Sequence, residues 1–198
     1  MSEVTASSTP RSAAFSMIRT VSLDEAAHRG RGEQGSPPPN WAMYEELTAS
    51  LEGWEKDGAL RENSLRLVEW LAVELACYLS LQLGRDQERV EQWLREFGDQ
   101  VCRAQQHPHP AGPSAIEILS VVVEVDARAQ DSAGAERLVR IGGPFLSYLR
   151  AGHELDDARE MALSLGLWAG DHLAQLLGYE AGRIASYLGA RDQAPPTP

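Results

Sequence analysis

Residues 63–83, NSLRLVEWLAVELACYLSLQL, are the stretch that decides the fold of this chain. Their apolar side chains recur every three or four residues, which is the period of an α-helix, and they cover more than one helix face. One side consists of Leu67, Leu71, Leu75 and Tyr78, and another consists of Trp70, Val73, Cys77 and Leu81. A helix that is apolar on nearly every face is typical of a protein core. The stretch therefore predicts a central, buried helix that begins after a capping Asn63 and ends at Gly84.

Similar patterns on both sides of this helix predict that the whole domain is helical. Residues 41–56 have an apolar stripe that Asp57-Gly58 ends, and Asp86 can cap a helix whose stripe continues to Val101. Further helices are expected to begin at Ser114, near Ala133, at Asp157 and near Glu180, the second of them bent or broken at Gly142-Gly143-Pro144. Residues 116–125 are rich in β-branched residues, but we interpret them as helix because no second segment offers a strand to pair with.

The first 39 residues differ in composition from the rest of the chain. Runs rich in Ser, Thr, Ala, Gly and Pro bury too little apolar surface to offset the entropy of ordering. Within them, Phe15, Ile18 and Val21 predict a short amphipathic segment near residues 13–27 that needs a surface to fold onto. We therefore expect an all-α protein with a disordered N-terminal arm over residues 1–39 and a flexible tail over 193–198. Between them, residues 40–192 are predicted to form a single six- or seven-helix domain, orthogonal or bundle-like.

The charge of the chain limits the partners that it attracts. The net formal charge is −11, and residues 1–39 contain four acidic and four basic side chains, so the acidity belongs to the helical domain. An acidic surface repels phosphate backbones and anionic lipids, which disfavours nucleic acids and membranes as partners. The most apolar stretch includes Arg66, Glu69 and Glu74, which are costly in a bilayer, and the first residues lack the pattern of a secretory signal. With Cys77 and Cys102 as the only cysteines, we expect a cytoplasmic protein without a disulfide.

Residues 173–188, LAQLLGYEAGRIASYL, have the spacing of a helix, a glycine turn and a second helix. Ala174 is small where two helices would touch, and Gly178 can adopt the positive φ of the turn. The residues placed to pack inward are Leu173, Leu177, Tyr179, Ile184 and Leu188. The segment resembles the helix-turn-helix of bacterial regulators, including alternative sigma factors and response regulators, over about a tenth of the chain.

This resemblance implies DNA binding by residues 173–191, with Arg183, Ser186 and Arg191 as the candidate DNA-binding residues. The alternative is an αα-corner that closes the domain. Glu180, at the start of the second helix, favours the corner because groove readers normally present cations or amides to phosphate at that position.

The sequence contains no enzyme signature. A Gly-rich phosphate loop, a nucleophile elbow and the metal-binding motifs of helical enzymes are all missing. Cys102, His107 and His109 do not make a metal site, because no second His or Cys cluster completes a tetrahedron. The five tryptophans could line a ligand pocket, but aromatic residues more often pack in the core. We therefore expect no catalytic residue, no cofactor and no metal.

These observations predict a non-catalytic regulatory or adaptor protein that acts through protein–protein contacts of its helical domain. The amphipathic segment supplies the candidate partner-binding residues, Phe15, Ile18 and Val21, which would dock on the domain itself or on a partner. Two alternatives stay open at this point. One is a transcription regulator that binds DNA through residues 173–191, and the other is a helical pocket that senses a small molecule.

Overall fold

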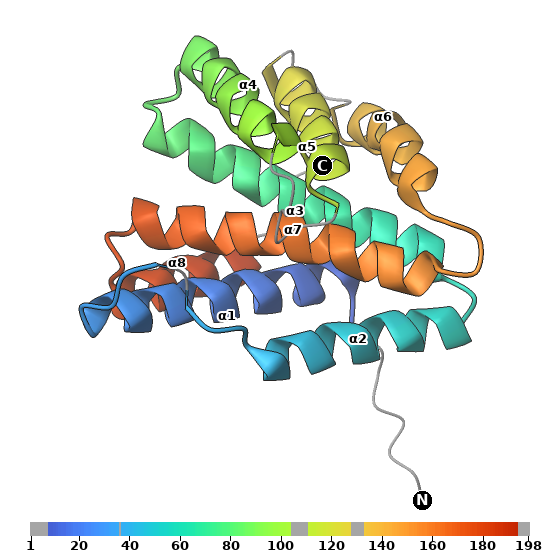
Figure 1. Cartoon of the computed structure of the whole chain (residues 1–198), viewed down its shortest axis with the longest axis horizontal. Helices are drawn as coiled ribbons and strands as arrows, with labels where there is room; N and C mark the ends of the chain where they lie inside the picture. The colour runs from blue at the N-terminus through green and yellow to red at the C-terminus, as the bar shows by residue number, and fades with distance from the viewer. Residues whose placement is uncertain (1–7, 36, 104–110, 128–132, 194–198) are drawn as a thin grey trace, which may run out of the picture.

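The computed structural model describes residues 8–35, 37–103, 111–127 and 133–193, and these residues form eight α-helices and no strand (Figure 1). In chain order the helices are α1 (Pro10–Gly30), α2 (Trp41–Lys56), α3 (Leu60–Gln82), α4 (Gln87–Arg103), α5 (Gly112–Ala127), α6 (Ala133–Tyr148), α7 (Glu154–Leu176) and α8 (Ala181–Gln193). The predicted all-α class is confirmed. The predicted number of six or seven helices is wrong, because residues 10–30 form an additional helix of the domain.

Helix α3 lies at the centre and packs against α1, α2, α4, α5, α6 and α7. Figure 1 shows α3 and α7 between two groups of helices, with α4, α5 and α6 on one side and α1, α2 and α8 on the other. One side of α3 is completely buried: Leu67, Leu71, Leu75 and Tyr78. The start of α3 differs from the prediction, because Asn63 lies inside the helix and donates its backbone N–H to the carbonyl of Ala59 at 2.9 Å.

The turn and cap signals of the sequence mostly correspond to real helix ends. Gly58 and Gly84 have φ of 71° and 74° after α2 and α3, a left-handed conformation that glycine adopts without strain. The Asp86 carboxylate accepts hydrogen bonds from two backbone N–H groups at the start of α4, at 3.1 and 3.3 Å. Residues 116–125 are helical, as predicted. Of the bend or break predicted at Gly142-Gly143-Pro144, the break is wrong, because α6 continues through Pro144.

Residues 10–30 contradict the prediction of a disordered arm, because they form α1 and pack against α3, α7 and α8. Phe15, Ile18 and Val21 are 4%, 0% and 6% exposed, so the predicted partner-binding residues belong to the core of the domain itself. Other buried residues of α1 are Ala13, Ala14, Met17 and Ala26. The oxygen of the Thr9 side chain caps the helix and accepts a backbone hydrogen bond at 3.2 Å. Residues 1–7 of the arm and 194–198 of the tail lie outside the described residues.

Two glycines of α7 explain how α1, a helix with many small and polar side chains, can pack closely against α7. A Cβ atom on Gly166 would lie 2.7 Å from Met17 Cε, and one on Gly170 would lie 2.5 Å from Val21 Cγ1. Both distances are shorter than van der Waals contact. The end of the Met17 side chain can move aside, whereas Val21 and the backbone of Ser22 cannot, so the close approach requires glycine most strictly at position 170. The two glycines are four residues apart and therefore share one face of α7. The small residues of α1 gain buried contacts because the partner helix has no side chain in the way.

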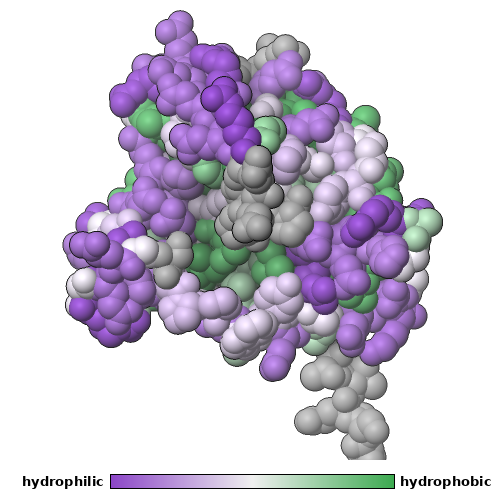
Figure 2. All heavy atoms as spheres, in the orientation of Figure 1, coloured by the Kyte–Doolittle hydropathy of each residue, from purple (hydrophilic) through white to green (hydrophobic). Residues whose placement is uncertain are grey.

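Figure 2 shows a mostly hydrophilic face of the molecule, on which apolar residues gather in a hollow near the centre. The hydrophilic surface agrees with the net charge of −11, and most aliphatic side chains are buried beneath it. Among the described residues, no single helix is long and apolar enough to cross a bilayer. Helices α3 and α4 meet that criterion only as a pair, and they are bent by 117° relative to each other.

Glu25 of α1 is a buried carboxyl whose burial is only partly compensated by neighbouring basic groups. Its side chain is 7% exposed, and its Oε2 atom has no hydrogen-bond partner among the described residues. Burial raises the pKa of this carboxyl above its ordinary value, and the negative charge of Asp171 raises it further, while Arg29 and His28 act in the opposite direction. The folded state therefore favours the protonated form of Glu25 more strongly than the unfolded chain does. Ionisation of this carboxyl destabilises the fold as the pH rises through the raised pKa.

Replacement of Glu25 by glutamine should therefore raise the melting temperature by a few degrees at neutral pH. The gain should vanish near about pH 4, where the glutamate of an unfolded chain takes up its proton. Thermal melts followed by circular dichroism across this pH range measure both effects. Glu62→Gln, on an exposed position of α3, is the control and should show no pH-dependent difference from wild type. A Glu25→Gln protein that melts below wild type at neutral pH would contradict this account.

Candidate binding groove

The second apolar side of α3 lines a groove, although Trp70 at its start also contacts Phe15 of α1, with ring centroids 6.4 Å apart. Trp70, Val73, Cys77 and Leu81 are only half-buried, although their pattern in the sequence is the same as that of the buried side. Together with residues of α4, α5, α6 and α8 they line an open groove with a volume of about 1050 Å³. This side of α3 is the main departure from the predicted all-round burial of the central helix.

The first half of α6 forms the wall opposite α3, and Arg137 holds it in place. The Arg137 guanidinium lies 3.4 Å from Oε1 of Glu69 on α3 and 2.8 Å from Oδ1 of Asp126 on α5. A second ion pair, between Arg140 and Glu124 at 2.6 Å, joins α6 to α5. Burial raises the pKa of Glu69, with the arginines opposing that shift, so the guanidinium of Arg137 compensates a costly buried carboxylate.

Apolar side chains dominate the wall where it faces the groove. Gly134 and Ala135 are small, and Leu138 and Val139 extend the apolar surface of the floor. Val139 is 79% exposed, so its apolar side chain faces solvent beside the groove. An exposed apolar residue next to an apolar groove extends the area that an occupant could cover.

The rim of the groove is basic, whereas the chain as a whole is acidic. Four arginines line it, at positions 66, 85, 137 and 191, against two carboxylates, Glu69 and Asp126. Arg191 is bound to the buried Glu74 at 3.0 Å. The guanidinium of Arg85 has no hydrogen bond or ion pair with the described part of the chain, and Arg66 has only a long contact of 3.8 Å to Glu69. Two arginines thus remain available for an occupant.

Cys77 lies on the floor of the groove, but it is a poor nucleophile there. Burial raises the pKa of its thiol, and the nearby Glu74 adds to that effect, so the thiol stays protonated at neutral pH. A protonated thiol suits an apolar binding surface better than a catalytic role. The surroundings of Cys77 also raise the pKa of the neighbouring Tyr187 to about 12, mainly through burial.

The helix-turn-helix-like corner has the predicted packing in part, because two of its five predicted inward residues, Leu177 and Tyr179, are only half-buried. Gly178 has φ of 69°, and the inward positions Leu173, Ala174, Ile184 and Leu188 are fully buried. Arg183 and Ser186 are exposed on α8, and Arg183 lies 3.5 Å from Glu180. Arg191 is instead engaged by Glu74 of α3. The structure therefore does not bring the three candidate DNA-binding residues together on one free surface, and DNA contact by Arg183 and Ser186 stays a prediction.

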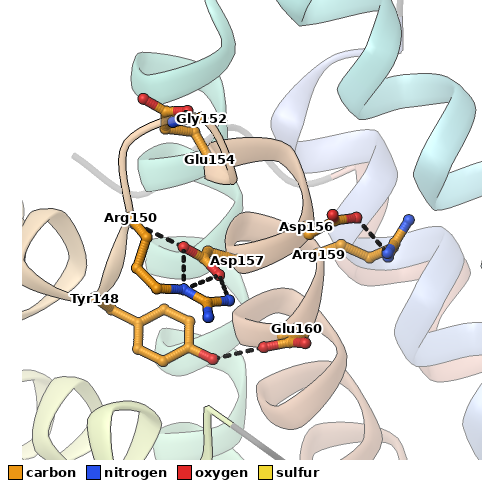
Figure 3. A network of polar contacts seen from close by, with 8 residues as sticks. All are labelled: Tyr148, Arg150, Gly152, Glu154, Asp156, Asp157, Arg159 and Glu160. Carbon is orange, nitrogen blue, oxygen red and sulfur yellow. Dashed lines mark hydrogen bonds and ion pairs between the residues drawn. The ribbon is translucent and has the colours of Figure 1, made fainter.

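A polar cluster lies where α6 is connected to α7 (Figure 3). Asp157 is fully buried and accepts hydrogen bonds from the backbone N–H of Arg150 at 2.6 Å and from its guanidinium at 2.5 Å. These bonds lower the pKa of Asp157. The Tyr148 hydroxyl donates to Glu160 at 2.7 Å. Asp157 was expected to begin a helix, but α7 begins at Glu154, and Asp157 instead fastens the preceding loop to α7.

Metal binding finds no support in the described part of the chain, where no three His, Cys, Asp or Glu side chains lie close enough to hold an ion. His107 and His109 lie outside the described residues. Comparisons with models of protein families, with curated proteins and with solved structures find no significant match. The groove on α3 is therefore the feature from which function has to be inferred.

One feature of the sequence indicated the groove: the second apolar side of the helix that forms α3. A second apolar side on a helix requires a second layer of covering helices. The pattern cannot tell whether that layer belongs to the same chain or to a partner. Phe15, Ile18 and Val21, which the amphipathic pattern indicated as docking residues, are buried in the domain itself, where α1 packs against α3, α7 and α8. The half-buried surface lies instead on α3, the helix expected to be most buried.

Proposed function

We infer that this protein is a non-catalytic regulatory or adaptor protein, and that it binds a segment of a partner protein in the groove between α3 and α6. The observation that supports this function best is the half-buried second side of α3, from Trp70 to Leu81. Apolar surface that is left facing a groove in a folded domain is typical of a protein interaction site. Trp70 and the adjoining arginines are residue types enriched in the energetically important part of protein interfaces.

Two exposed apolar residues of α6 provide a matched test. Val139 lines the groove, whereas Leu146, two turns further along the same helix, does not, and they are 79% and 53% exposed. Val139→Asp should weaken partner binding by about tenfold, or about 1.4 kcal/mol, because a carboxylate in an apolar contact has to be desolvated. Leu146→Asp should bind like wild type. Neither change should alter the melting temperature much, because both positions face solvent.

The measurement is affinity capture from cells that express the chain naturally, quantified by mass spectrometry for wild type and both variants. Proteins retained by wild type and by Leu146→Asp but lost with Val139→Asp are groove partners. Cys77, on the groove floor, should react slowly with iodoacetamide even at alkaline pH, where part of its thiol ionises, and more slowly still when the groove is occupied, while the exposed Cys102 serves as an internal control. A capture profile that is identical for Val139→Asp and wild type, with an unchanged alkylation rate of Cys77, would rule out this function.

A further inference from the structure

We propose that the segment bound in this groove is an amphipathic helix with acidic side chains near both ends, an inference that rests on the proposed function. The floor residues Trp70, Val73, Cys77 and Leu81 recur every three or four positions along α3. Such a row forms a ridge along a helix, and a second helix packs its own ridges beside it. The floor therefore matches an occupant with the same periodicity as α3.

A helix suits this groove better than an extended peptide for a reason of hydrogen bonding. The described residues contain no strand, so no free strand edge is available to pair with an extended backbone. An extended peptide would bury its backbone N–H and C=O groups against apolar side chains without partners. A helix satisfies these groups internally and leaves only its side chains to contact the groove. The small residues Gly134 and Ala135 on the opposite wall leave room for its backbone.

The charges at the two ends of the floor specify the ends of the occupant. Arg66 lies one turn before Trp70, and Arg85 follows the end of α3. These are the two groove arginines without a close carboxylate, since Arg137 and Arg191 have ion pairs within the described residues. Spanning both requires about 25 Å, or roughly 17 residues of helix. Acidic residues at other positions of the partner helix would be repelled by this acidic domain. The two arginines therefore also set the position of the partner helix along the groove.

The test is selection of binders for the full chain from a displayed library of helical 18-residue peptides with randomised surface positions. Peptides that bind wild type are counter-selected against Val139→Asp, so that only groove binders remain. We expect acidic residues to be enriched at both ends of these peptides. Arg66→Glu combined with Arg85→Glu should weaken their binding about tenfold or more, and peptides with lysine at the ends should regain it.

The control has the same change in net charge elsewhere: Arg89→Glu with Arg95→Glu, two exposed positions of α4. It should leave binding unchanged, and melting temperatures should show that all variants are folded. Groove binders with no acidic preference, or with equal affinity for the Arg66/Arg85 variant, would overturn this inference and leave the proposed function standing. Failure to obtain any binder that depends on Val139 would count against both.

Discussion

Replacing Gly170 with alanine is expected to lower the free energy of unfolding by about 3 kcal/mol. The new methyl group would lie 2.5 Å from Val21 Cγ1 and 3.2 Å from the backbone nitrogen of Ser22. Rotation of a side chain does not relieve a clash with backbone, so α1 has to move away from α7. That movement would expose Phe15 and Ile18, which are at most 4% exposed in the native fold. Urea unfolding followed by tryptophan fluorescence measures the loss.

Two further variants show whether this loss comes from helix docking. Gly189→Ala changes a glycine of α8 whose added methyl group meets nothing within 4 Å, so it should stabilise the chain by about 0.5–1 kcal/mol through helix propensity. Val21→Ala in the Gly170→Ala background should recover little of the loss, because the Val21 Cβ atom and the backbone nitrogen of Ser22 still lie too close to the new methyl group. If Gly170→Ala unfolds within about 0.5 kcal/mol of wild type, α1 is not packed on α7 as described.

Replacing Arg191 with alanine is expected to destabilise the domain by about 3 kcal/mol. Glu74 is 1% exposed on the central helix, and the Arg191 guanidinium is its ion-pair partner, with distances of 3.0 and 3.2 Å to Oε1. Without Arg191 a carboxylate stays buried with its main compensating charge removed. The free energy of desolvation is then no longer offset, which makes removal of one partner worse than removal of both. Equilibrium unfolding in urea is again the measurement.

The double variant Glu74→Met with Arg191→Met tests this reasoning. Two apolar side chains of similar length should restore most of the stability, because no buried charge is left without a partner. A structural role of Arg191 other than this ion pair would leave the double variant as unstable as Arg191→Ala. Arg183→Ala, on the exposed face of the same helix, should change stability by less than about 0.5 kcal/mol.

Local signals in the sequence predicted most of the helices. The apolar period of α3, the Asp86 cap and the glycines after α2 and α3 act over a few residues, so they can be recognised without knowledge of the fold. Two predicted helix starts, at Asn63 and Asp157, are wrong for an identifiable reason. Asn63 and Asp157 are residue types that favour helix starts, but here both lie inside helices, and Asp157 bonds to Arg150 instead. A residue type allows a cap, and the surrounding contacts decide whether the cap forms.

The candidate site was predicted only in part. The residues of its floor were identified as a second apolar side of α3, but they were expected to lie in the core. The residues expected to bind a partner lie in the core, because Gly166 and Gly170 admit α1 to the face of α7. Arg191, expected to face DNA, meets a carboxylate 117 residues away in the sequence. The packing of α1 on α7 and the ion pair of Arg191 with Glu74 join distant segments, so the local sequence pattern does not predict them.

The sequence by itself determined that this protein is an all-α domain around the helix at residues 60–82, because helical period, caps and turn glycines are short-range properties. Only the tertiary structure decided which apolar surfaces are covered. It placed α1 in the core and left the side of α3 from Trp70 to Leu81 open to a groove with an arginine rim. The physical reason is that burial depends on which helices can approach one another. That depends on glycine contacts and ion pairs between segments far apart in the chain.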